Sequence, residues 1–429
     1  MADENKTELT YLSKYQANSL IFTLDDEKIE MDPSNILSIE LLQDYDMNYQ
    51  IITKVQLRMD VRKLLWILEN KRDITCKFVL SVVAVDNDSN SLVSNPQYVI
   101  NDDFNIYFTD EYENIDIDMF KQRLAVNSRT SVNDINDENY FESQNIIDIY
   151  LYNKKLIESS SMIYNEIMTE DILQNFVARM LTKTKHEKVL MSKFENNDVY
   201  KEIVVPPMAV YRALGYLDTL YGFHKKGTQI FYDYDILYIL NTIGECTAKR
   251  DKEWTQTTIL ATSLENSAAG NGMKVIEGDE IYYLQVPIEN VGTQKFSNTN
   301  NEIMGSEIHE ILIDDININY IEADQDYVER RNVYKLQRYK DLNKFAAERL
   351  KARMEEADLS LYITGDNYDI RALRPNHEYN VIFDDETRQQ KYGNFKYRIA
   401  YLFTYIKMSN TDYLDSSHKI ILRKAVDKD

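Results

Sequence analysis

The chain has 429 residues, with 71 acidic against 49 basic side chains and a formal net charge of −22. Such an acidic protein repels a nucleic-acid backbone and an anionic membrane surface, so we expect neither sequence-specific nucleic acid nor a membrane as partner. The hydrophobic fraction of 44% is typical of globular proteins, and the length predicts roughly three domains.

The start of the chain is polar and acidic, unlike a signal peptide, and we expect residues 1–18 to form an N-terminal arm. The longest apolar run, residues 78–85, is too short to span a bilayer. Cys76 and Cys246 are too few for a disulfide framework, so we expect reduced thiols. These features predict a soluble protein that folds in a cytoplasm.

Residues 19–125 have the pattern of short strands separated by polar turns. In residues 51–61, Val55, Leu57 and Met59 alternate with polar side chains, which is the period of a half-buried strand. An apolar face over residues 63–69 predicts one short helix. This region therefore predicts a small antiparallel β-barrel or sandwich. Its other expected strands are residues 20–24, 36–42, 74–85 and 104–108.

The middle of the chain mixes helical and strand periods. Residues 126–145 are rich in Asn, Asp and Ser, and we expect a linker there. Residues 146–249 predict an α/β domain, in which Thr169 is expected to cap a helix with its apolar face over residues 172–181. The other expected elements are strands 146–152, 189–192 and 200–205 and a short helix, residues 154–159.

Residues 204–240 are the most strongly punctuated stretch. Pro206 and Pro207 are expected at the start of a helix, where a missing N–H group costs nothing. Apolar side chains recur at helical spacing up to residue 221. Gly222 is expected to end that helix in a left-handed conformation, and a strand follows over residues 229–240.

Residues 250–429 return to strand patterns and form the last expected domain. Residues 326–357 contain neither Pro nor Gly and predict a helix about 48 Å long. Its basic side chains form either a solvated face with intrahelical ion pairs or a docking edge for an acidic neighbour. Strands are expected at residues 255–261, 281–286, 308–316, 359–363, 378–383, 399–406 and 420–422.

The predicted fold class is α+β. Two small antiparallel β-barrel domains flank a mixed α/β middle domain, and one long helix precedes the last strands. We also expect the two barrel regions to share one strand order.

No catalytic or metal-binding motif is complete. His309-Glu310 lacks the second histidine of a zinc-protease helix, because Ile313 stands in its place. The segment from Asp86 lacks the glycine and the bidentate glutamate of a calcium loop. The acidic pairs at residues 25–26, 102–103 and 384–385 fit solvated turns better than acid–base catalysis. We therefore expect no enzyme activity, no cofactor and no bound metal.

Residues 204–240 resemble the tail-hub (baseplate hub) proteins of contractile-tailed phages, whose fold is shared with type VI secretion spike proteins. In that family a strand closing on proline is followed by a helix A-L-x-x-L-D-x-x-Y-G and a strand G-x-x-x-F-x-D-x-D. The resemblance extends more weakly over most of residues 19–424. The matching positions are Pro206, Pro207, Ala213, Leu214, Leu217, Asp218, Tyr221, Gly222, Gly227, Phe231, Asp233 and Asp235.

The resemblance implies a virion structural protein without enzyme activity. It implies a homotrimeric ring in which two barrels per subunit match a hexameric tail tube, while the other side receives a trimeric spike. The implied partners are further copies of the chain, the tail tube protein, the spike protein, and baseplate wedge or tape-measure proteins. The implied location is the baseplate of the phage tail, after synthesis in the host cytoplasm.

Two alternatives stay open at the level of sequence. The surplus of carboxylates and aromatic residues also suits a cell-wall glycan-degrading enzyme of the same particle. A cytoplasmic protein–protein adaptor unrelated to phages would explain the 32 tyrosines, which favour interfaces, although AT-rich coding would explain them too.

Overall fold

The computed structural model describes residues 8–45, 51–86, 92, 94–109, 117–118, 144–186, 188–224, 227–233, 236–241, 256–262, 272–276, 281–296, 358–375, 377–408 and 413–427. This part of the chain is rich in strands, with few helices. Most strands join one large mixed sheet, and two smaller sheets belong to the middle of the chain. The α+β class is thus confirmed in its coarse form. The long helix expected over residues 326–357 and most of the expected linker lie outside the described residues.

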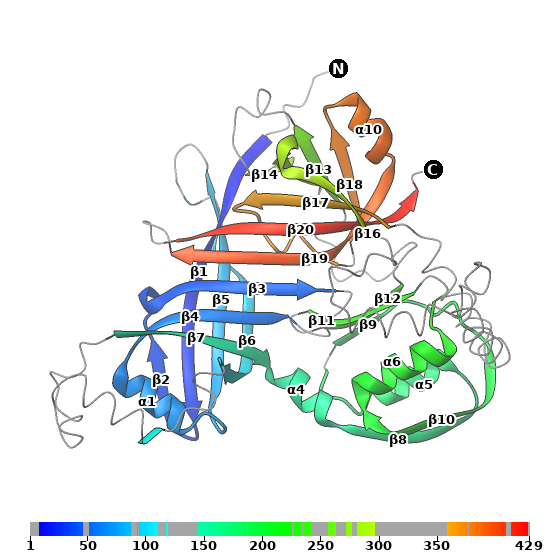
Figure 1. Ribbon diagram of the computed structural model, residues 1–429, viewed down its shortest axis with the longest axis horizontal. Coiled ribbons are helices and arrows are strands. Elements are labelled where there is room, and N and C mark those ends of the chain that lie inside the picture. The colour runs from blue at the N-terminus through cyan, green and yellow to red at the C-terminus, as the bar shows by residue number, and fades with distance from the viewer. Residues whose placement is uncertain are drawn as a thin grey trace, which may run out of the picture.

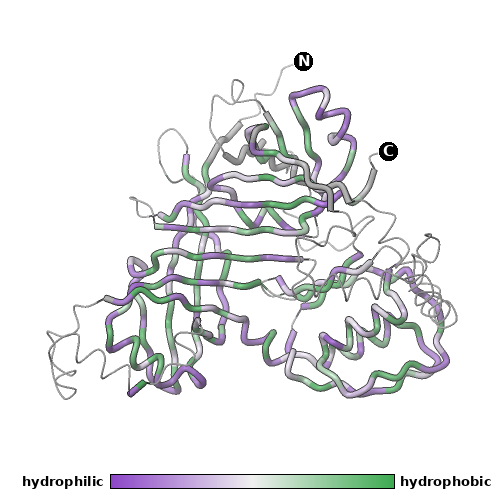
Figure 2. Tube along the Cα trace, in the orientation of Figure 1, coloured by the Kyte–Doolittle hydropathy of each residue, from purple (hydrophilic) through white to green (hydrophobic). Residues whose placement is uncertain are grey.

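The N-terminal strands are joined entirely by antiparallel pairs, in the order β3-β4-β7-β6-β5-β1. β2 pairs with β1, and α1 follows β4 directly. Hydrophobic and hydrophilic residues alternate along these strands, as Figure 2 shows. The bounds are β1 (Glu8–Leu24), β2 (Glu27–Met31), η1 (Pro33–Asn35), β3 (Ile36–Asp44), β4 (Ile52–Asp60), α1 (Val61–Glu69), β5 (Thr75–Asp86), β6 (Gln97–Phe108) and β7 (Gln144–Asn153).

The C-terminal strands continue the same sheet, in the order β14-β15-β13-β18-β19-β20-β17-β16. The two sets of strands meet where β3 pairs with β19 and where β1 pairs with β14 and β20 (Figure 1). The bounds are β13 (Gln256–Thr262), β14 (Gly272–Ile276), β15 (Ile281–Pro287), η4 (Ile288–Asn290), β16 (Val291–Phe296), β17 (Asp358–Asp366), β18 (Tyr379–Phe383), α10 (Glu386–Tyr392), β19 (Phe395–Met408) and β20 (Leu414–Asp427).

The middle region lies beside the large sheet, with α5 and α6 over one face of the β8–β10 pair (Figure 1). Its second sheet has the order β11-β12-β9. The bounds are α4 (Lys154–Ser161), β8 (Ile163–Ile172), α5 (Leu173–Leu181), β9 (Lys188–Met191), β10 (Val199–Ala209), α6 (Val210–Tyr221), β11 (Thr228–Asp233) and β12 (Ile236–Asn241).

Two hydrophobic cores meet at β11 and β12. Phe231, Tyr238 and Leu240 are buried in the core of the large sheet. Tyr232 and Ile239, one residue away in the same strands, are buried in the core of the middle region. Because successive side chains of a strand point to opposite faces, this small sheet is covered on both sides and joins the two cores.

Several sequence expectations are wrong in detail. β1 begins at Glu8, inside the expected arm, because residues 8–11 pair with β14 and residues 11–23 pair with β5. β7, assigned from sequence to the middle domain, pairs with β4 and β6. Thr169 lies in β8 and does not cap α5, which begins without a side-chain cap.

The second β region is not purely antiparallel, in contrast to the prediction. β13 runs parallel to both β15 and β18. After β13, the chain forms the antiparallel hairpin β14–β15. In the sheet, β15 lies between β14 and β13 and runs parallel to β13. The strands of the N-terminal and C-terminal regions belong to one continuous sheet and do not form two separate barrels.

A unit of five strands nevertheless occurs twice in this sheet. The two copies are β3-β4-β7-β6-β5 and β16-β17-β20-β19-β18. In each copy the first, second, fifth, fourth and third strands along the chain lie side by side in that order, and all neighbours are antiparallel. The expected shared order therefore holds for these five strands. It fails for the preceding strand, because β1 is antiparallel to β5 whereas β13 is parallel to β18.

Candidate functional site

The catalytic candidates do not come together in the described residues. His309 and Glu310 lie outside them, as does most of the segment after Asp86. Asp102 and Asp103 are neighbours in β6 and therefore point to opposite faces. Asp385 is the N-cap of α10, where its carboxylate accepts the N–H of Thr387. Within the described part of the chain, no three His, Cys, Asp or Glu side chains gather into a metal site.

The motif residues of α6 form a buried face. Ala213, Leu214 and Leu217 are fully buried in the core of the middle region, as their helical spacing predicts. Pro206 and Pro207 do not start this helix. They are exposed within β10, where the register with β8 shifts between Val205 and Met208. A proline has no N–H to donate to a ladder, so a bulge accepts it where a regular strand would not.

The turn from α6 to β11 is closed by Asp218. Its Oδ1 accepts hydrogen bonds from the Phe223 N–H (3.0 Å) and the Thr228 hydroxyl (2.8 Å). Gly222 ends the helix at φ 70°, as predicted, and Gly227 has φ 117°. These are values that L side chains rarely adopt, so both glycines are required by the backbone. The fixed turn sets the direction in which β11 leaves the helix.

Asp233 joins three parts of the chain. This fully buried residue at the end of β11 accepts a hydrogen bond from Gln43 Nε2 of β3 (3.2 Å) on Oδ1. Its Oδ2 pairs with Arg374 Nη1 of the segment after β17 (3.4 Å). The carboxylate thus connects the middle region to both five-strand units. Sequence analysis identified Asp233 but gave no signal for Gln43 or Arg374.

Aromatic rings surround this junction. Phe231 stacks on Tyr238 at 5.0 Å and meets the edge of Tyr45 at 4.7 Å, and the Tyr45 hydroxyl accepts a hydrogen bond from Gln43. Of the motif positions, Asp218, Gly222 and Gly227 come together at the turn and Phe231 and Asp233 at the junction. Tyr221 packs edge-on against Tyr200, and Asp235 lies outside the described residues.

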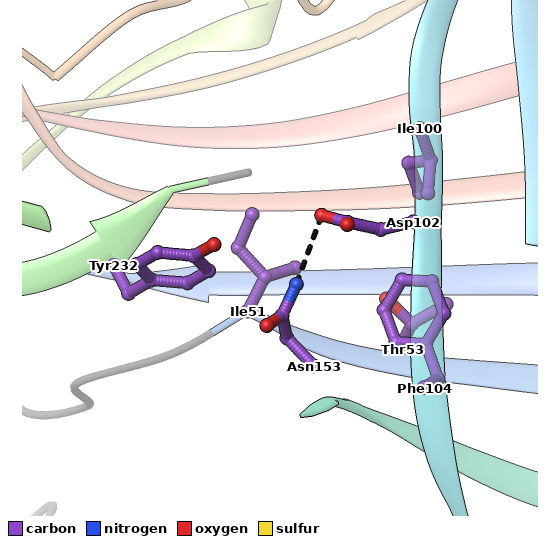
Figure 3. A pocket seen from close by; sticks show the side chains of 7 residues that line it. All are labelled: Ile51, Thr53, Ile100, Asp102, Phe104, Asn153 and Tyr232. Carbon is purple, nitrogen blue, oxygen red and sulfur yellow. Dashed lines mark hydrogen bonds between the residues drawn. The ribbon is translucent and has the colours of Figure 1, made fainter. Parts of the chain in front are cut away.

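A pocket with about 350 Å³ of empty space, part of it open to solvent, lies where the N-terminal strands face β11. Figure 3 shows Asp102 reaching from β6 toward Tyr232 of β11, with Asn153 between them. Burial raises the pKa of the Asp102 carboxyl, against the opposing effect of the Lys155 and Lys77 charges. The reading of residues 102–103 as a solvated turn is wrong, because both residues lie in β6 and Asp102 is half-buried at an inward position of that strand.

His186 lies on the other side of Tyr232. Its ring is 5.0 Å from the Tyr232 ring, and its Nε2 is hydrogen-bonded to the Tyr211 hydroxyl of α6. Burial and the nearby Lys155 charge lower the pKa of His186 to about 4. The imidazole is therefore neutral near pH 7 and acts as a packing group between β11 and α6.

The comparisons with known proteins can be set against this geometry. A family model described as Bacteriophage PBS1 gene 109 protein matches residues 10–425. A search of the curated proteins found no match. No helix in the described ranges is long and apolar enough to cross a membrane.

Among solved structures, the chain is similar to a tail protein from Neisseria meningitidis, with 10% identity, a TM-score of 0.39, and 96% and 97% of the two chains covered. It is also similar to the 43 kDa tail protein of prophage MuSo2 from Shewanella oneidensis, with 10% identity, a TM-score of 0.38, and 95% and 99% covered. A type VI secretion component from E. coli has 6% identity and a TM-score of 0.39, with 95% and 76% covered. These scores are too low to support a conclusion about assembly.

Proposed function

Because the chain belongs to the family described as Bacteriophage PBS1 gene 109 protein, we propose that it is a structural protein of a phage tail. Within the tail we propose the role of baseplate hub, a homotrimeric ring that adapts the hexameric tail tube to a trimeric spike. Its partners are then further copies of itself, the tube protein, the spike protein, and wedge or tape-measure proteins. Its location is the virion.

The observation that supports this role is the repeated unit of five strands. Closed rings join through repeated equivalent contacts, so a trimer can match a hexamer only if each subunit offers two similar faces. In this proposal the two faces are supplied by the units β3-β4-β7-β6-β5 and β16-β17-β20-β19-β18, which share one strand order. Within one chain they already meet, because the edge strand β3 of the first unit pairs antiparallel with β19, an inner strand of the second unit.

In this proposal the two barrel domains are built around the repeated units. The boundaries expected from sequence, residues 19–125 and 250–429, then need adjustment in the first domain. β1 from residue 8 and β7 up to residue 153 belong with it, because both pair with its strands. The middle domain begins after Asn153, with α4.

A glycan-degrading enzyme has less support than the hub. Hydrolysis of glycans needs two carboxyl groups that flank one bond. The pair at residues 102–103 is divided between the two faces of β6, and Asp385 is engaged as a helix cap. We therefore propose a non-enzymatic role, with the wall-degrading activity on another protein of the particle.

Electron microscopy of the purified particle, together with the purified chain at high concentration, tests the hub role. We expect a threefold ring with a central opening, located between tube and spike. Labelling of this chain at any other position in the particle would contradict the proposal. Turnover of cell-wall glycans by the purified chain would replace it with the enzyme alternative.

A further inference from the structure

The pocket beside Asp102 has a chemistry that the hub role does not use. Its walls come from two bodies: β4, β6 and the end of β7 belong to the large sheet, and Tyr232 belongs to the middle region (Figure 3). Ile51, Ile100 and Phe104 make part of the wall apolar. A group bound here would touch both bodies at once.

Asp102 occupies a position that strand alternation reserves for apolar residues. On β6 the inward side chains Ile100, Phe104, Ile106 and Phe108 are all buried. Asp102 falls in this row, whereas its neighbour Asp103 is exposed on the other face. A carboxylate on an inward face is costly unless a donor or a positive charge compensates it. The protein supplies hydrogen bonds from the Asn153 amide and the Asp103 backbone and the nearby charges of Lys155 and Lys77, but burial outweighs them and raises the pKa of Asp102.

The side-chain donor is Asn153, which holds the carboxylate in one orientation. The side-chain Nδ2 of Asn153 donates to Asp102 Oδ2 (2.9 Å). The side-chain Oδ1 of Asn153, which is the N-cap residue of α4, accepts the Leu156 N–H (3.1 Å). Both ends of the amide are therefore engaged, and the asparagine cannot turn away. One carboxylate oxygen is occupied by this bond, so Asp102 does not present both oxygens as a free pair.

We infer that this pocket binds the ammonium group of a lysine side chain from a neighbouring protein. An ammonium group has three donors and no acceptor, and the pocket lining offers the Asp102 carboxylate and the hydroxyls of Thr53 and Tyr232. The apolar wall suits the methylene stem of lysine. An arginine fork fits less well, because it favours a carboxylate with both oxygens free. The net charge of −22 attracts a basic partner.

The test uses n-butylammonium chloride as the probe and n-butanol as its uncharged counterpart, with ligand-observed saturation-transfer NMR on the full chain. We expect a clear signal from the probe with the native chain and at least a fivefold weaker signal with Asp102→Asn. Asp103→Asn is the matched control: it removes the same charge one residue away, on the exposed face, and should leave the signal unchanged. The butanol signal should be the same for all three proteins.

A second variant tests the pocket independently of Asp102. Tyr232→Phe keeps the ring and removes one acceptor, so we expect about a threefold weaker probe signal. An unchanged signal in Asp102→Asn, or an equal loss in Asp103→Asn, would reduce the effect to general attraction by an acidic surface and would overturn the inference. Binding that appears only in Lys155→Gln would overturn it too, because this chain's own lysine would then be the occupant.

A pH titration decides the question if Asp102→Asn does not fold. Binding of n-butylammonium to the native chain should fall as the pH drops and the carboxyl group takes up a proton, while the butanol signal stays constant. A probe signal that does not change between pH 7 and pH 3 in folded protein would contradict a carboxylate site. None of these outcomes depends on whether the chain forms a trimer.

Discussion

The two five-strand units share one strand order, but the segments that follow their second strands are built in different ways. After β4 the chain forms the helix α1. After β17, at the equivalent place, it forms a loop that begins at Asn367 and leads to β18. Both segments cover the sheet, so the same structural requirement has two solutions in one molecule.

The helical solution is apolar. Leu64, Leu65, Ile67 and Leu68 of α1 are buried, and Asp60 caps the helix with a hydrogen bond from the Lys63 N–H to its Oδ1 (2.9 Å). Burial of such side chains is favourable at any pH, because none of them titrates. The stability that α1 contributes therefore comes from packing.

The loop buries apolar side chains too, among them Ile370 and Leu373, but it adds buried polar contacts to this packing. The Tyr15 hydroxyl donates to the Tyr368 carbonyl (2.7 Å) and accepts from the Ile370 N–H (3.1 Å), and the Tyr379 hydroxyl binds the backbone of Ala372 and Arg374. The His418 ring stacks on the Tyr368 ring, and His418 Nε2 accepts a hydrogen bond from the backbone N–H of Tyr368 (3.2 Å). Gly365 makes room for this ring, since a Cβ there would overlap it. The loop has no regular ladder of its own, so buried side chains satisfy its backbone.

Equivalent positions in the fold thus depend on different forces. The first unit should respond to changes in shape and volume. The second should respond to changes in charge and protonation, because its loop depends on an ion pair and a buried histidine. Substitutions in the two segments can test this division.

The largest effect is expected for Leu64→Asp in α1. It places an unpaired carboxylate in the core and removes a packed side chain, which together cost about 5 kcal/mol or more. That is a large share of the roughly 5–15 kcal/mol that stabilises a domain, so we expect an insoluble or unfolded protein. Arg62→Asp, an exposed position of the same helix, is the control and should melt like the native protein. A normal melt for Leu64→Asp would show that α1 is not buried.

Arg374→Met is expected to have the next largest effect. It leaves the fully buried Asp233 carboxylate without its cation, and breaking one side of a buried pair costs about 3 kcal/mol. Lys183→Met is the matched control, because Lys183 and Glu166 form a pair at 2.9 Å with side chains 56% and 33% exposed. That pair contributes less than about 1 kcal/mol. Urea unfolding measures both losses, and equal losses would remove the distinction between the two kinds of contact.

The local elements of this fold could be predicted from sequence, because their signals are local. The alternation over residues 51–61 and the apolar face of residues 63–69 correspond to β4 and α1. Gly222 ends α6 as its backbone freedom predicts. The resemblance carried by residues 204–240 is confirmed at the level of a phage protein family.

Contacts between distant residues could not be predicted, because no local pattern encodes them. Nothing in the sequence around β3 indicates that it pairs with β19, some 360 residues later along the chain. The Asp233–Arg374 ion pair cannot be predicted from sequence for the same reason. Pro206 and Pro207 were placed at a helix start because sequence does not distinguish that position from a strand bulge, which also leaves a proline without an N–H partner.

The pH dependence of stability tests the polar loop. The Tyr368 N–H can only donate, so His418 Nε2 is unprotonated and the neutral ring carries its proton on Nδ1, 3.0 Å from the Thr404 hydroxyl. Burial lowers the pKa of His418 to about 3. The unfolded chain, with a histidine pKa near 6.5, therefore binds more protons below that pH, and stability falls as the pH drops from about 6.5 toward 3.

At pH 5 the loss from His418 should be on the order of 2 kcal/mol. His186 contributes with the same sign, since its pKa is also lowered, so His418→Asn is needed to isolate the effect. Urea unfolding between pH 7 and pH 5 should show a shallower slope in the variant. Hydrogen exchange, corrected for intrinsic rates, should show earlier opening at Tyr368 than in α1 as the pH falls. Equal pH dependence at both places would contradict the division of forces.

The smallest effect is expected for Asp60→Ala, which removes the cap of α1. An N-cap carboxylate satisfies one backbone N–H that the helix cannot, and its loss typically costs about 1 kcal/mol. Asp60→Asn should retain nearly all of this stability, because asparagine offers an acceptor of the same shape. The free energy of unfolding in urea at pH 7 measures both losses. A loss of 3 kcal/mol or more for Asp60→Ala, or an equal loss for Asp60→Asn, would mean that α1 depends on a buried charge as well as on packing, and the contrast between the two segments would disappear.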